Sequence, residues 1–370
     1  MWHTVSLRDV CDISSSKRIF AKEYQTEGVP FYRGKEVIEK HKGCNVSTEL
    51  FISPERYKEI KSKYAVPRKG DILLTSVGTL GVPWLVDEED FYFKDGNLTW
   101  LRCNAEILPS YLYHWFNSAE AQNQIDARCI GSTQKALTIE TLNKFQITLP
   151  ALEIQKKIIS IIEPIELKIS NNREINENLE KQAQTLYQQI FITNRNPNWK
   201  KGVLADLVIV KYGKDHKKLG DGIYPVYGSG GIMRYAEKPI YTGESVLIPR
   251  KGTLNNVMYV NGAFWSVDTM FYTEMQHSNI AKFVYHFVKS KDLASMNAGS
   301  AVPSMTTNIL NAIQLYIPDN ETLSTFEEII SPMYVQIHKN EEQSKKLVDL
   351  RDTLLPRLIS GELDVSKIEF

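Results

Sequence analysis

The chain has 370 residues, with 44 basic and 44 acidic side chains and 42% hydrophobic residues. This length exceeds the size at which a single hydrophobic core usually stops growing, so we expect two domains. No run of about 18 uncharged apolar residues is present, and the first residues lack the basic start and apolar stretch of a secretory signal. These features exclude a membrane-spanning or secreted protein and predict a soluble, cytoplasmic one.

The cysteines and histidines show no pattern of metal ligands. Cys11, Cys44, Cys103 and Cys129 all lie in the first half of the chain, without a CxxC motif or a Cys/His spacing, and the seven histidines also lack ligand spacing. We therefore expect reduced thiols rather than disulfides, and no metal site.

The formal net charge of zero hides an uneven distribution. Residues 1–150 hold 19 basic and 19 acidic side chains, whereas residues 193–318 hold 14 basic and 8 acidic ones. Residues 151–192 hold 5 basic and 6 acidic side chains, and residues 319–370 hold 6 and 11. The chain is therefore not uniformly basic, and its charge is partitioned by segment, with a basic surplus of six in residues 193–318.

A long internal repeat is the strongest feature of the sequence. The stretch GSTQKALTIETLNKFQITLP at 131–150 has a counterpart at 299–318, and a shift of 168 positions aligns 131–192 with 299–360 without a gap. Of these 62 aligned positions, 17 are identical. Upstream, GDILLTSVGTLG matches GESVLIPRKGTLN, so we infer a tandem duplication of about 180 residues.

Each repeat begins with a portion that combines strands and helices. Short β-branched and aromatic runs punctuated by Gly and Asn predict a mainly antiparallel sheet. Aromatic residues three and four positions apart predict helices within 110–125 and 281–293. The expected fold class is α+β, with two similar recognition domains at 1–150 and 193–318, a central helical spacer at 151–192 and a C-terminal helical spacer at 319–370.

The spacers carry two heptad seams that predict a pair of long antiparallel helices. Both seams turn polar near the middle, where Asn172 facing Asn340 would fix the register; the alternative is a solvated helix face. Pro164 and Pro332 should mark where the helices begin, because proline fits the first turn of a helix. The first seam consists of Ile158, Ile162, Ile165, Ile169, Asn172, Asn176, Leu179, Ala183, Leu186 and Ile190, and the second of Phe326, Ile330, Met333, Ile337, Asn340, Ser344, Leu347, Arg351, Leu354 and Leu358.

Two similar domains joined by long helices suit a target with two half-sites, such as duplex DNA. A helix from Pro164 to Ile192 would span roughly 43 Å, which is commensurate with one turn of B-DNA at about 34 Å. The N-terminal portions of the two repeats differ in length: Gly70 follows Asp9 by 61 positions, but Gly243 follows Asp206 by only 37. Different loops predict two different half-sites and hence an asymmetric target.

At this point the residues resemble a known family, the specificity subunit of type I restriction-modification systems. The resemblance lies in the phrases LPALEIQKKIISIIEPIE, NNREINENLEKQAQTLYQQIF and LRDTLLPRLISGELDV. It implies two target recognition domains on double-stranded DNA, and helices that set the spacing and bind two methyltransferase subunits. It also implies restriction (motor-nuclease) subunits as partners, with S-adenosylmethionine and ATP bound by those partners, so no cofactor is expected here. The second copy departs from the pattern, because Leu323 stands where the first copy has Gln155.

Two motifs could suggest catalysis, and both favour a structural interpretation. NPNW at 196–199 is similar to the motif with which amino-methyltransferases hold a flipped base, but Asn198 replaces the second proline, so we expect a linker turn. VYGSGGI at 226–232 lacks the surrounding βαβ unit of a cofactor loop. We predict a noncatalytic DNA-recognition subunit. The alternatives are a self-contained DNA adenine methyltransferase or restriction enzyme of related design, and a coiled-coil scaffold that binds no DNA.

Candidate DNA contacts lie in loops that mix basic, amide and hydroxyl side chains, because phosphates attract Lys and Arg whereas base edges are read by polar groups. For each, ordinary solvated surface is the alternative. The repeated Gly-Ser and Gly-Thr-Leu positions are favoured, since glycine permits close backbone approach to phosphate. The candidates are Lys17, Arg18, Tyr32, Arg33, Lys35, Ser76, Gly78, Thr79, Gly131, Ser132, Gln134 and Lys135 in the first domain, and Tyr212, Lys214, His216, Lys217, Tyr227, Ser229, Arg250, Lys251, Thr253, Asn255, Gly299 and Ser300 in the second.

Overall fold

The computed structural model describes residues 2–44, 46–128, 136–296 and 304–368, which form two compact units. Unit 1 comprises Met1–Asn172 and Glu341–Phe370, and unit 2 comprises Arg173–Asn340. Both boundaries fall inside the long helices, so the four predicted segments do not coincide with the two units and their exact bounds stay a prediction. No helix in the described ranges is both long and apolar enough to cross a membrane.

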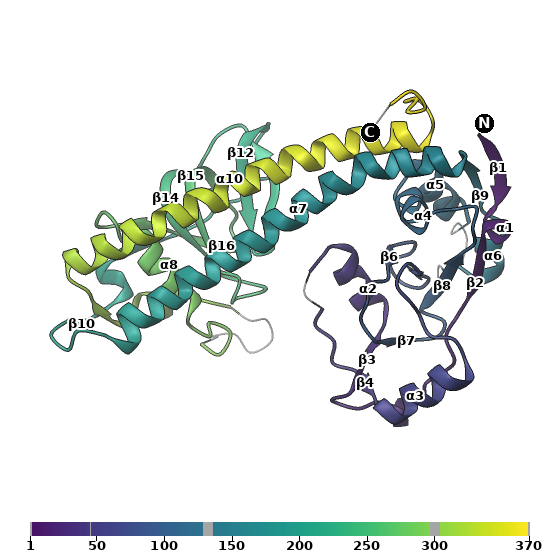
Figure 1. Cartoon of the computed structure of the whole chain (residues 1–370). Coiled ribbons are helices and arrows are strands. Elements are labelled where there is room, and N and C mark those ends of the chain that lie inside the picture. The colour runs from purple at the N-terminus through teal and green to yellow at the C-terminus, as the bar shows by residue number, and fades with distance from the viewer. Residues whose placement is uncertain (1, 45, 129–135, 297–303, 369–370) are drawn as a thin grey trace. The chain divides into compact units, whose positions relative to one another are not determined.

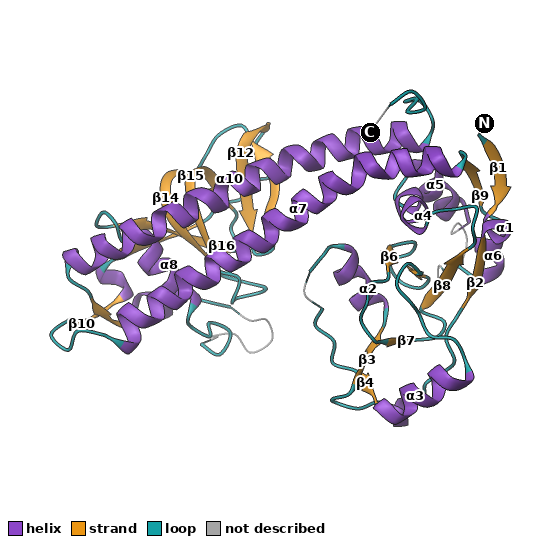
Figure 2. Ribbon diagram, in the orientation of Figure 1, coloured by secondary structure: helices purple, strands orange, loops and turns teal. Residues whose placement is uncertain are grey.

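Unit 1 begins with three small sheets (Figure 2). The four-stranded sheet, in the order β2-β8-β5-β6, is antiparallel throughout, and the three-stranded sheet, β4-β3-β7, contains one parallel pair. The third sheet pairs β1 with β9. The strands are β1 (His3–Ser6), β2 (Cys11–Ser14), β3 (Val29–Tyr32), β4 (Phe51–Ile52), β5 (Ile72–Thr75), β6 (Pro83–Leu85), β7 (Tyr92–Phe93), β8 (Leu98–Cys103) and β9 (Gln146–Leu149).

In the described part of unit 1 before residue 150, six α-helices and one short 3-10 turn accompany these sheets. Both α4 and α5 fall where aromatic spacing predicts helix, and α4 buries Tyr111, Trp115 and Phe116 in the unit's main core. Cys11, Cys44 and Cys103 are free thiols. The helices are α1 (Leu7–Val10), α2 (Gly34–His41), α3 (Pro54–Lys63), α4 (Pro109–Phe116), α5 (Ala119–Arg128) and α6 (Ile139–Asn143), with η1 at Ala21–Glu23.

Unit 2 is built on a larger six-stranded sheet in the order β11-β16-β14-β15-β12-β13, in which only β12 and β15 pair in parallel. A separate pair joins β10 to β17. The predicted α+β class with mainly antiparallel sheets is therefore confirmed. The elements are β10 (Lys200–Val203), η3 (Leu204–Asp206), β11 (Val208–Tyr212), β12 (Asp221–Gly228), β13 (Gly231–Ala236), β14 (Tyr241–Pro249), β15 (Met258–Ser266), β16 (Met270–Met275), α8 (Ala281–Lys289), α9 (Thr307–Asn311) and β17 (Gln314–Ile317).

The repeated sequence folds twice into the same local structure. Thr138 and Thr306 are equivalent N-caps, whose side chains accept hydrogen bonds from the third residue of α6 and α9. Asp9 and Asp206 accept equivalent bonds from the backbone three residues earlier. Side-chain capping satisfies backbone N–H groups that would otherwise lack partners, which explains why these positions recur.

Each spacer is a single long helix (Figure 1). Helix α7 (Leu152–Tyr187) continues into a π-helical turn, η2 (Gln188–Thr193), and α10 spans Asn320–Ile359. At 36 and 40 residues, the helices extend about 54 and 60 Å. They begin two residues after Pro150 and Pro318, where the extended β9 and β17 have ended.

The prediction that Pro164 and Pro332 start the helices is therefore wrong, because both prolines lie inside them. A proline in a helix interior frees the carbonyl four residues earlier and costs about 3 kcal/mol. Both prolines are exposed, as are Ser160 and Glu328 four residues before them, so water can solvate the freed carbonyl groups. Packing along the seams then outweighs the local cost.

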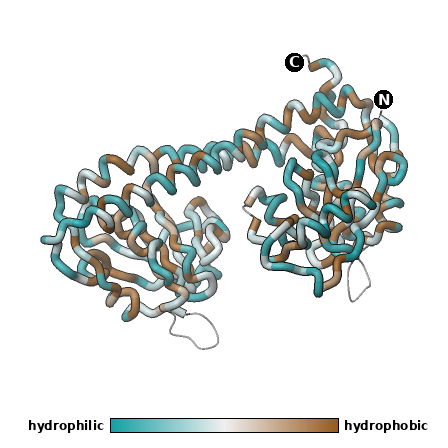
Figure 3. The backbone as a smooth tube through the Cα atoms, turned by 60° about the horizontal axis from the view of Figure 1, so that its bottom comes forward, coloured by the Kyte–Doolittle hydropathy of each residue, from teal (hydrophilic) through white to brown (hydrophobic). Residues whose placement is uncertain are grey.

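The heptad seams are confirmed within each unit. In unit 1, the first half of α7 shares a hydrophobic cluster with the end of α10, through Ile158 and Ile162 on one helix and Leu358 on the other. In unit 2, the second half of α7 packs on the start of α10, through Ala183 and Phe326. Early residues of one helix thus meet late residues of the other, as antiparallel packing requires. Hydrophobic and hydrophilic residues alternate along both helices (Figure 3).

The polar middle of each seam is hydrogen-bonded. In unit 1, Asn172 Nδ2 donates to Gln343 Oε1 at 3.0 Å and to Ser344 Oγ at 3.2 Å. In unit 2, Asn340 Nδ2 donates to Asn176 Oδ1 at 2.7 Å. The Asn172–Ser344 and Asn340–Asn176 contacts are equivalent in the repeat, because Asn340 and Ser344 follow Asn172 and Asn176 by 168 residues. Asn172 and Asn340 each bond a residue one helical turn after the position of the other asparagine. Their role in selecting the register stays a prediction.

A buried histidine should make unit 2 sensitive to acid. The ring nitrogens of His286 lie 2.8 Å from Gln184 Oε1 and 2.9 Å from Tyr334 Oη. Burial, helped by the Lys289 charge, lowers the pKa of His286 from 6.5 to about 3. Between these values the unfolded chain binds a proton that the folded chain does not, so stability is full above pH 6.5 and is lost as the pH falls towards 3.

We expect His286 to contribute a loss of about 1.4 kcal/mol in unfolding free energy per pH unit within this window. Urea unfolding from pH 7 to pH 5 measures it, and the His286→Gln variant should show a correspondingly shallower slope. Identical slopes for the two chains would contradict the assignment.

Candidate nucleic-acid interface

The Gly-Thr-Leu repeat of unit 1 forms an exposed turn between β5 and β6. Gly78 has a φ of +82°, a conformation that strains any residue with a Cβ. The turn is held by a β-bridge between Val77 and Ala136, and Leu137 N donates to Ser76 O at 2.9 Å. This first turn (Gly78–Leu80) therefore lies against the residues that directly follow the repeated Gly-Ser segment.

Unit 2 contains the same arrangement. Gly252 has a φ of +85°, Lys251 forms a β-bridge with Ser304, and Met305 N donates to Arg250 O at 2.9 Å. In this second turn (Gly252–Leu254), Leu254 is buried in the main core of the unit. In both units the segment of the Gly-Thr-Leu turn is thus paired with the described residues that follow the Gly-Ser segment. The candidates Gly131, Ser132, Gln134, Lys135, Gly299 and Ser300 lie outside the described residues.

The second turn also touches the tip of the β12–β13 hairpin, which is the predicted YGSGG loop. Asn256 Nδ2 donates to the backbone oxygen of Ser229 at 2.6 Å. A Cβ atom built on Gly252 would lie 3.1 Å from Ser229 Oγ, whereas one built on Gly78 would meet nothing within 4 Å. The hairpin tip and the second turn therefore form one continuous surface.

This difference gives a matched pair of variants. Gly78→Ala carries only backbone strain and should cost about 1 kcal/mol of unfolding free energy. Gly252→Ala carries the same strain and also displaces Ser229, so we expect a larger loss of stability and a loss of DNA affinity. Equal effects of the two variants, in urea unfolding and in DNA titration, would show that the Ser229 contact is unimportant.

A cation stacked on an aromatic ring lies beside the second turn. The Arg250 guanidinium is 5.4 Å from the ring centre of Tyr212, and its Nη1 donates to the Asp268 backbone oxygen at 3.2 Å. Tyr212 is half exposed on β11. The structure thus brings together Tyr212 and Arg250, which lie 38 residues apart in the sequence.

The other candidates of unit 2 divide into exposed and structural residues. Lys214 and Lys217 are exposed in the loop between β11 and β12, where His216 is half-buried. Thr253 is exposed in the second turn. By contrast, Tyr227 packs against the second core of the unit, and Asn255 holds the 292–294 segment through bonds to Asp292 Oδ1 and the Ala294 backbone.

In unit 1, the described basic candidates have acidic, carbonyl or aromatic partners. Arg18 pairs with Asp95 at 2.8 Å and Arg33 with the buried Glu36 at 3.0 Å. Lys35 donates to the Ser47 backbone oxygen. Lys17 lies 4.8 Å above the half-exposed ring of Tyr64. Arg33 caps α2, whose first residue, Gly34, approaches Thr75 at the end of β5.

Two candidates are placed in the core instead of on the surface. Tyr32 is 3% exposed, stacks on Phe91 and donates its hydroxyl to Glu89 at 2.7 Å. Ser76 is 3% exposed, and its hydroxyl lies 2.6 Å from Thr99 Oγ1. Neither side chain can reach a base edge as placed, because both are buried. Gly78 and Thr79, two and three residues later, are exposed.

Sequence reasoning missed several residues that shape these surfaces. Val77 is 43% exposed at the first turn, and Ile223, Ile232 and Met233 are exposed on the β12–β13 hairpin. Exposed apolar residues in a turn or on a hairpin strand carry no sequence signal for binding. The pairing of Val77 with Ala136 could not be detected from spacing, because 59 positions separate these two residues whereas 53 separate their counterparts, Lys251 and Ser304.

The NPNW motif, which could suggest catalysis, has a structural role. In NPNW, Asn196 Oδ1 accepts from the Asn198 backbone within a turn, and Trp199 is buried and donates to Asp319 at 2.9 Å. The predicted linker turn is confirmed.

Gln155 is fully buried and bonds the backbone of Glu106, while its counterpart Leu323 packs in the core of unit 2. Their difference therefore changes internal packing rather than an exposed partner surface.

Within the described ranges, no three His, Cys, Asp or Glu side chains are grouped to hold a metal ion. The expected absence of a cofactor stays a prediction.

Comparisons with known proteins agree on one family. Residues 1–181 and 196–347 match the family described as the type I restriction modification DNA specificity domain. The chain is 22% identical to the specificity subunit of the type I restriction enzyme MjaIX of Methanocaldococcus jannaschii, in a match that covers 99% of this chain and 94% of that protein. A putative type I restriction enzyme specificity subunit of Haemophilus influenzae is 32% identical over 164 residues, which are 44% of this chain and 40% of that protein.

A crystal structure of the S subunit of a type I restriction-modification system from M. genitalium is similar in fold. The TM-score is 0.63 at 17% identity, and the match covers 97% of this chain and 96% of that one. At this identity the likeness shows the fold alone.

Proposed function

The chain belongs to the family of type I restriction modification DNA specificity domains, and from that premise we propose that it is the DNA-recognition subunit of a type I restriction-modification complex. Each unit reads one half of a bipartite target on double-stranded DNA. The long helices recruit two methyltransferase subunits, and restriction subunits join the assembly.

One observation carries this proposal: each of the two family matches covers one repeat, and each repeat holds a Gly-Thr-Leu turn whose glycine and threonine are exposed. Each turn is paired with the described residues that follow its Gly-Ser segment. Turns with backbone N–H groups and glycine at positive φ can approach phosphates closely. Two equivalent surfaces on two units suit two half-sites.

The two half-sites should differ in sequence. The residues before the first turn are Ser76 and Val77, whereas those before the second are Arg250 and Lys251. Arginine reads guanine through two hydrogen bonds, which serine and valine cannot imitate. We therefore propose an asymmetric target.

The chain itself catalyses neither methyl transfer nor cleavage in this proposal, and S-adenosylmethionine and ATP bind to the partner subunits. The internal roles of Asn196 and Trp199 support this view, because a base-holding motif needs a free amide and an accessible ring. The purified chain, mixed with DNA and labelled S-adenosylmethionine, should transfer no label until methyltransferase subunits are added. Transfer by the chain alone would favour the self-contained enzyme.

A further inference from the structure

Unit 2 contains a buried ammonium group in a box of acids and aromatic rings. Lys282 on α8 is 5% exposed, and its Nζ lies 2.9 Å from Glu244 and also bonds Glu327. The same Nζ lies 5.3 Å from the ring centre of Tyr259 and 5.8 Å from that of Tyr334. Carboxylates and ring faces together stabilise a cation that is removed from water.

The corresponding place in unit 1 can be identified residue by residue. Helices α4 and α8 align without a gap through their shared Tyr-His pair, Tyr113–His114 and Tyr285–His286, which places Ser110 at the position of Lys282. The long helices align at the 168-residue offset, which places Glu166 at the position of Tyr334.

Contacts in the two units support this alignment. His286 Nε2 lies 2.9 Å from Tyr334 Oη, and His114 Nε2 lies 3.6 Å from Glu166. The same histidine therefore faces the same helix position in both units.

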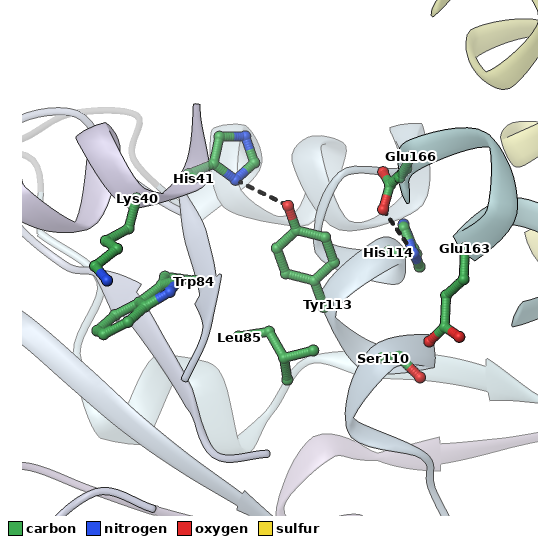
Figure 4. Close-up of a pocket in the computed structure, with 9 residues that line it drawn as sticks. All are labelled: Lys40, His41, Trp84, Leu85, Ser110, Tyr113, His114, Glu163 and Glu166. Carbon is green, nitrogen blue, oxygen red and sulfur yellow. Dashed lines mark hydrogen bonds and ion pairs between the residues drawn. The ribbon is translucent and has the colours of Figure 1, made fainter. Parts of the chain in front are cut away.

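Where unit 2 has a filled box, unit 1 has a pocket with a volume of about 270 Å³ (Figure 4). Its walls come from α2, β6, α4 and α7, all within unit 1. Replacement of lysine by the short Ser110 and of tyrosine by Glu166 accounts for the space. The lining residues are Lys40, His41, Trp84, Leu85, Ser110, Tyr113, His114, Glu163 and Glu166.

The cation already at the edge of the pocket is engaged elsewhere. Lys40 Nζ lies 3.0 Å from Asp87 and 2.8 Å from Glu89, and 5.1 Å from the Trp84 ring centre. It forms no ion pair with Glu163 or Glu166, whose carboxylates come from α7.

The two α7 carboxylates are poorly compensated. In the described part of the chain, Glu163 forms no ion pair. Glu166 has Arg351 only at 3.9 Å, and that guanidinium is held by Asp352 at 2.7 Å. Burial raises the pKa of Glu166, the Arg351 charge lowers it in part, and the Glu163 charge raises it further. Because the net shift is upward, an additional positive charge would be favourable here.

The two histidines of the lining can also accept a hydrogen bond. His41 Nδ1 lies 2.8 Å from the Pro83 carbonyl and must donate to it, and burial lowers the pKa of this ring, so the free Nε2 is an acceptor. His114 is 2% exposed, and its Nδ1 has no hydrogen-bond partner among the described residues. The pocket thus suits a donor with positive charge.

We propose that this pocket binds an external ammonium or guanidinium group, which occupies in unit 1 the place that the Lys282 side chain fills in unit 2. The carboxylates of Glu163 and Glu166 pair with the cation, and the rings of Trp84 and Tyr113 flank it. The site is distinct from the Gly-Thr-Leu turns and does not depend on DNA binding.

The direct test uses n-butylammonium, an analogue of the lysine side chain, with the full-length chain and ligand-observed NMR. We expect saturable binding, and binding of the neutral isostere n-butanol that is at least about tenfold weaker, because the charge-assisted bonds are lost. Equal binding of the two compounds would overturn the proposal.

Variants locate the site. Glu163→Gln and the double variant Glu163→Gln/Glu166→Gln should weaken n-butylammonium binding, by about tenfold for the pair. Glu174→Gln, which removes an exposed carboxylate elsewhere on α7, should not. Ser110→Lys supplies an internal ammonium and should abolish binding, whereas Ser110→Ala should preserve it. Undiminished binding of n-butylammonium by the Ser110→Lys chain would overturn the assignment. If the Ser110→Lys chain does not fold, undiminished binding by the Glu163→Gln chain would overturn it instead.

Two sources could supply the cation in the cell: a lysine or arginine side chain of a docking protein, or a free amine. Assembly with methyltransferase subunits separates them, and this arm alone rests on the proposed function. Weaker assembly of the Ser110→Lys chain assigns the site to a partner side chain. Undiminished assembly, together with displacement of n-butylammonium by spermidine, assigns it to a free amine. Both results uphold the site.

Discussion

Replacement of Lys282 by alanine is expected to cost about 3 kcal/mol of unfolding free energy, because it leaves the carboxylates of Glu244 and Glu327 without their cation. Breaking a buried ion pair from one side costs about 3–5 kcal/mol, and the lower end applies since the Glu244 side chain is 32% exposed. Lys282 also packs against Tyr259 and Tyr334, so the cation–aromatic contacts are lost as well. Urea unfolding of the wild-type and variant chains measures the difference.

An exposed ion pair provides the control. Lys69 lies 2.6 Å from Glu88, but both side chains are more than two-thirds exposed, so Lys69→Ala should leave the urea midpoint nearly unchanged. If Lys282→Ala lost as little unfolding free energy as Lys69→Ala, the ion pairs of Lys282 would contribute nothing to stability. The comparison of the unit 1 pocket with this buried ammonium site would then no longer support a cation in the pocket.

The second large effect concerns the surface beside the second Gly-Thr-Leu turn. Arg250→Ala should weaken specific DNA binding by about 1–3 kcal/mol if the guanidinium contacts guanine, and Lys251→Ala should lower the log-log salt slope by about one. Arg250 is held near Tyr212, which reduces the conformational entropy lost on binding. Binding is measured in the complex assembled with methyltransferase subunits, over a range of salt concentrations.

Lys238→Ala is the matched control, because Lys238 is exposed in unit 2 but follows β13, at the opposite end of that strand from the hairpin tip. It should alter neither the affinity nor the slope. Unchanged affinity and slope in the Arg250→Ala/Lys251→Ala chain would instead place the contact in the loop from Lys214 to Lys218.

Much of the fold could be predicted because the long helices follow from a periodic pattern of hydrophobic residues. The seams from Ile158 and Phe326 onwards repeat at heptad spacing, and helical packing depends on that spacing almost alone. The starts of the helices were mispredicted because the packing of the seams on either side of Pro164 and Pro332 stabilises the helices by more than each proline costs locally. A rule for isolated helices does not describe a helix stabilised by its neighbours.

The candidate interface was predictable only in part. Gly78 and Gly252 could be identified because the repeat marks them and positive φ demands glycine. The burial of Tyr32 could not be predicted, since the four-residue strand β3 is too short to reveal which face is inward. That of Ser76 could not, since it follows β5 and depends on a contact with Thr99, 23 residues away. The pocket could not be predicted from the sequence because it depends on Ser110 and Glu166, which belong to no sequence motif. Their significance follows only from their alignment with Lys282 and Tyr334.

Mapping of methylated bases in DNA modified by the assembled complex tests the central claim most directly, which is that two different units read two different half-sites. We predict two short specific half-sites of different sequence separated by a nonspecific spacer. A perfect palindrome, or a single uninterrupted site, would contradict the account.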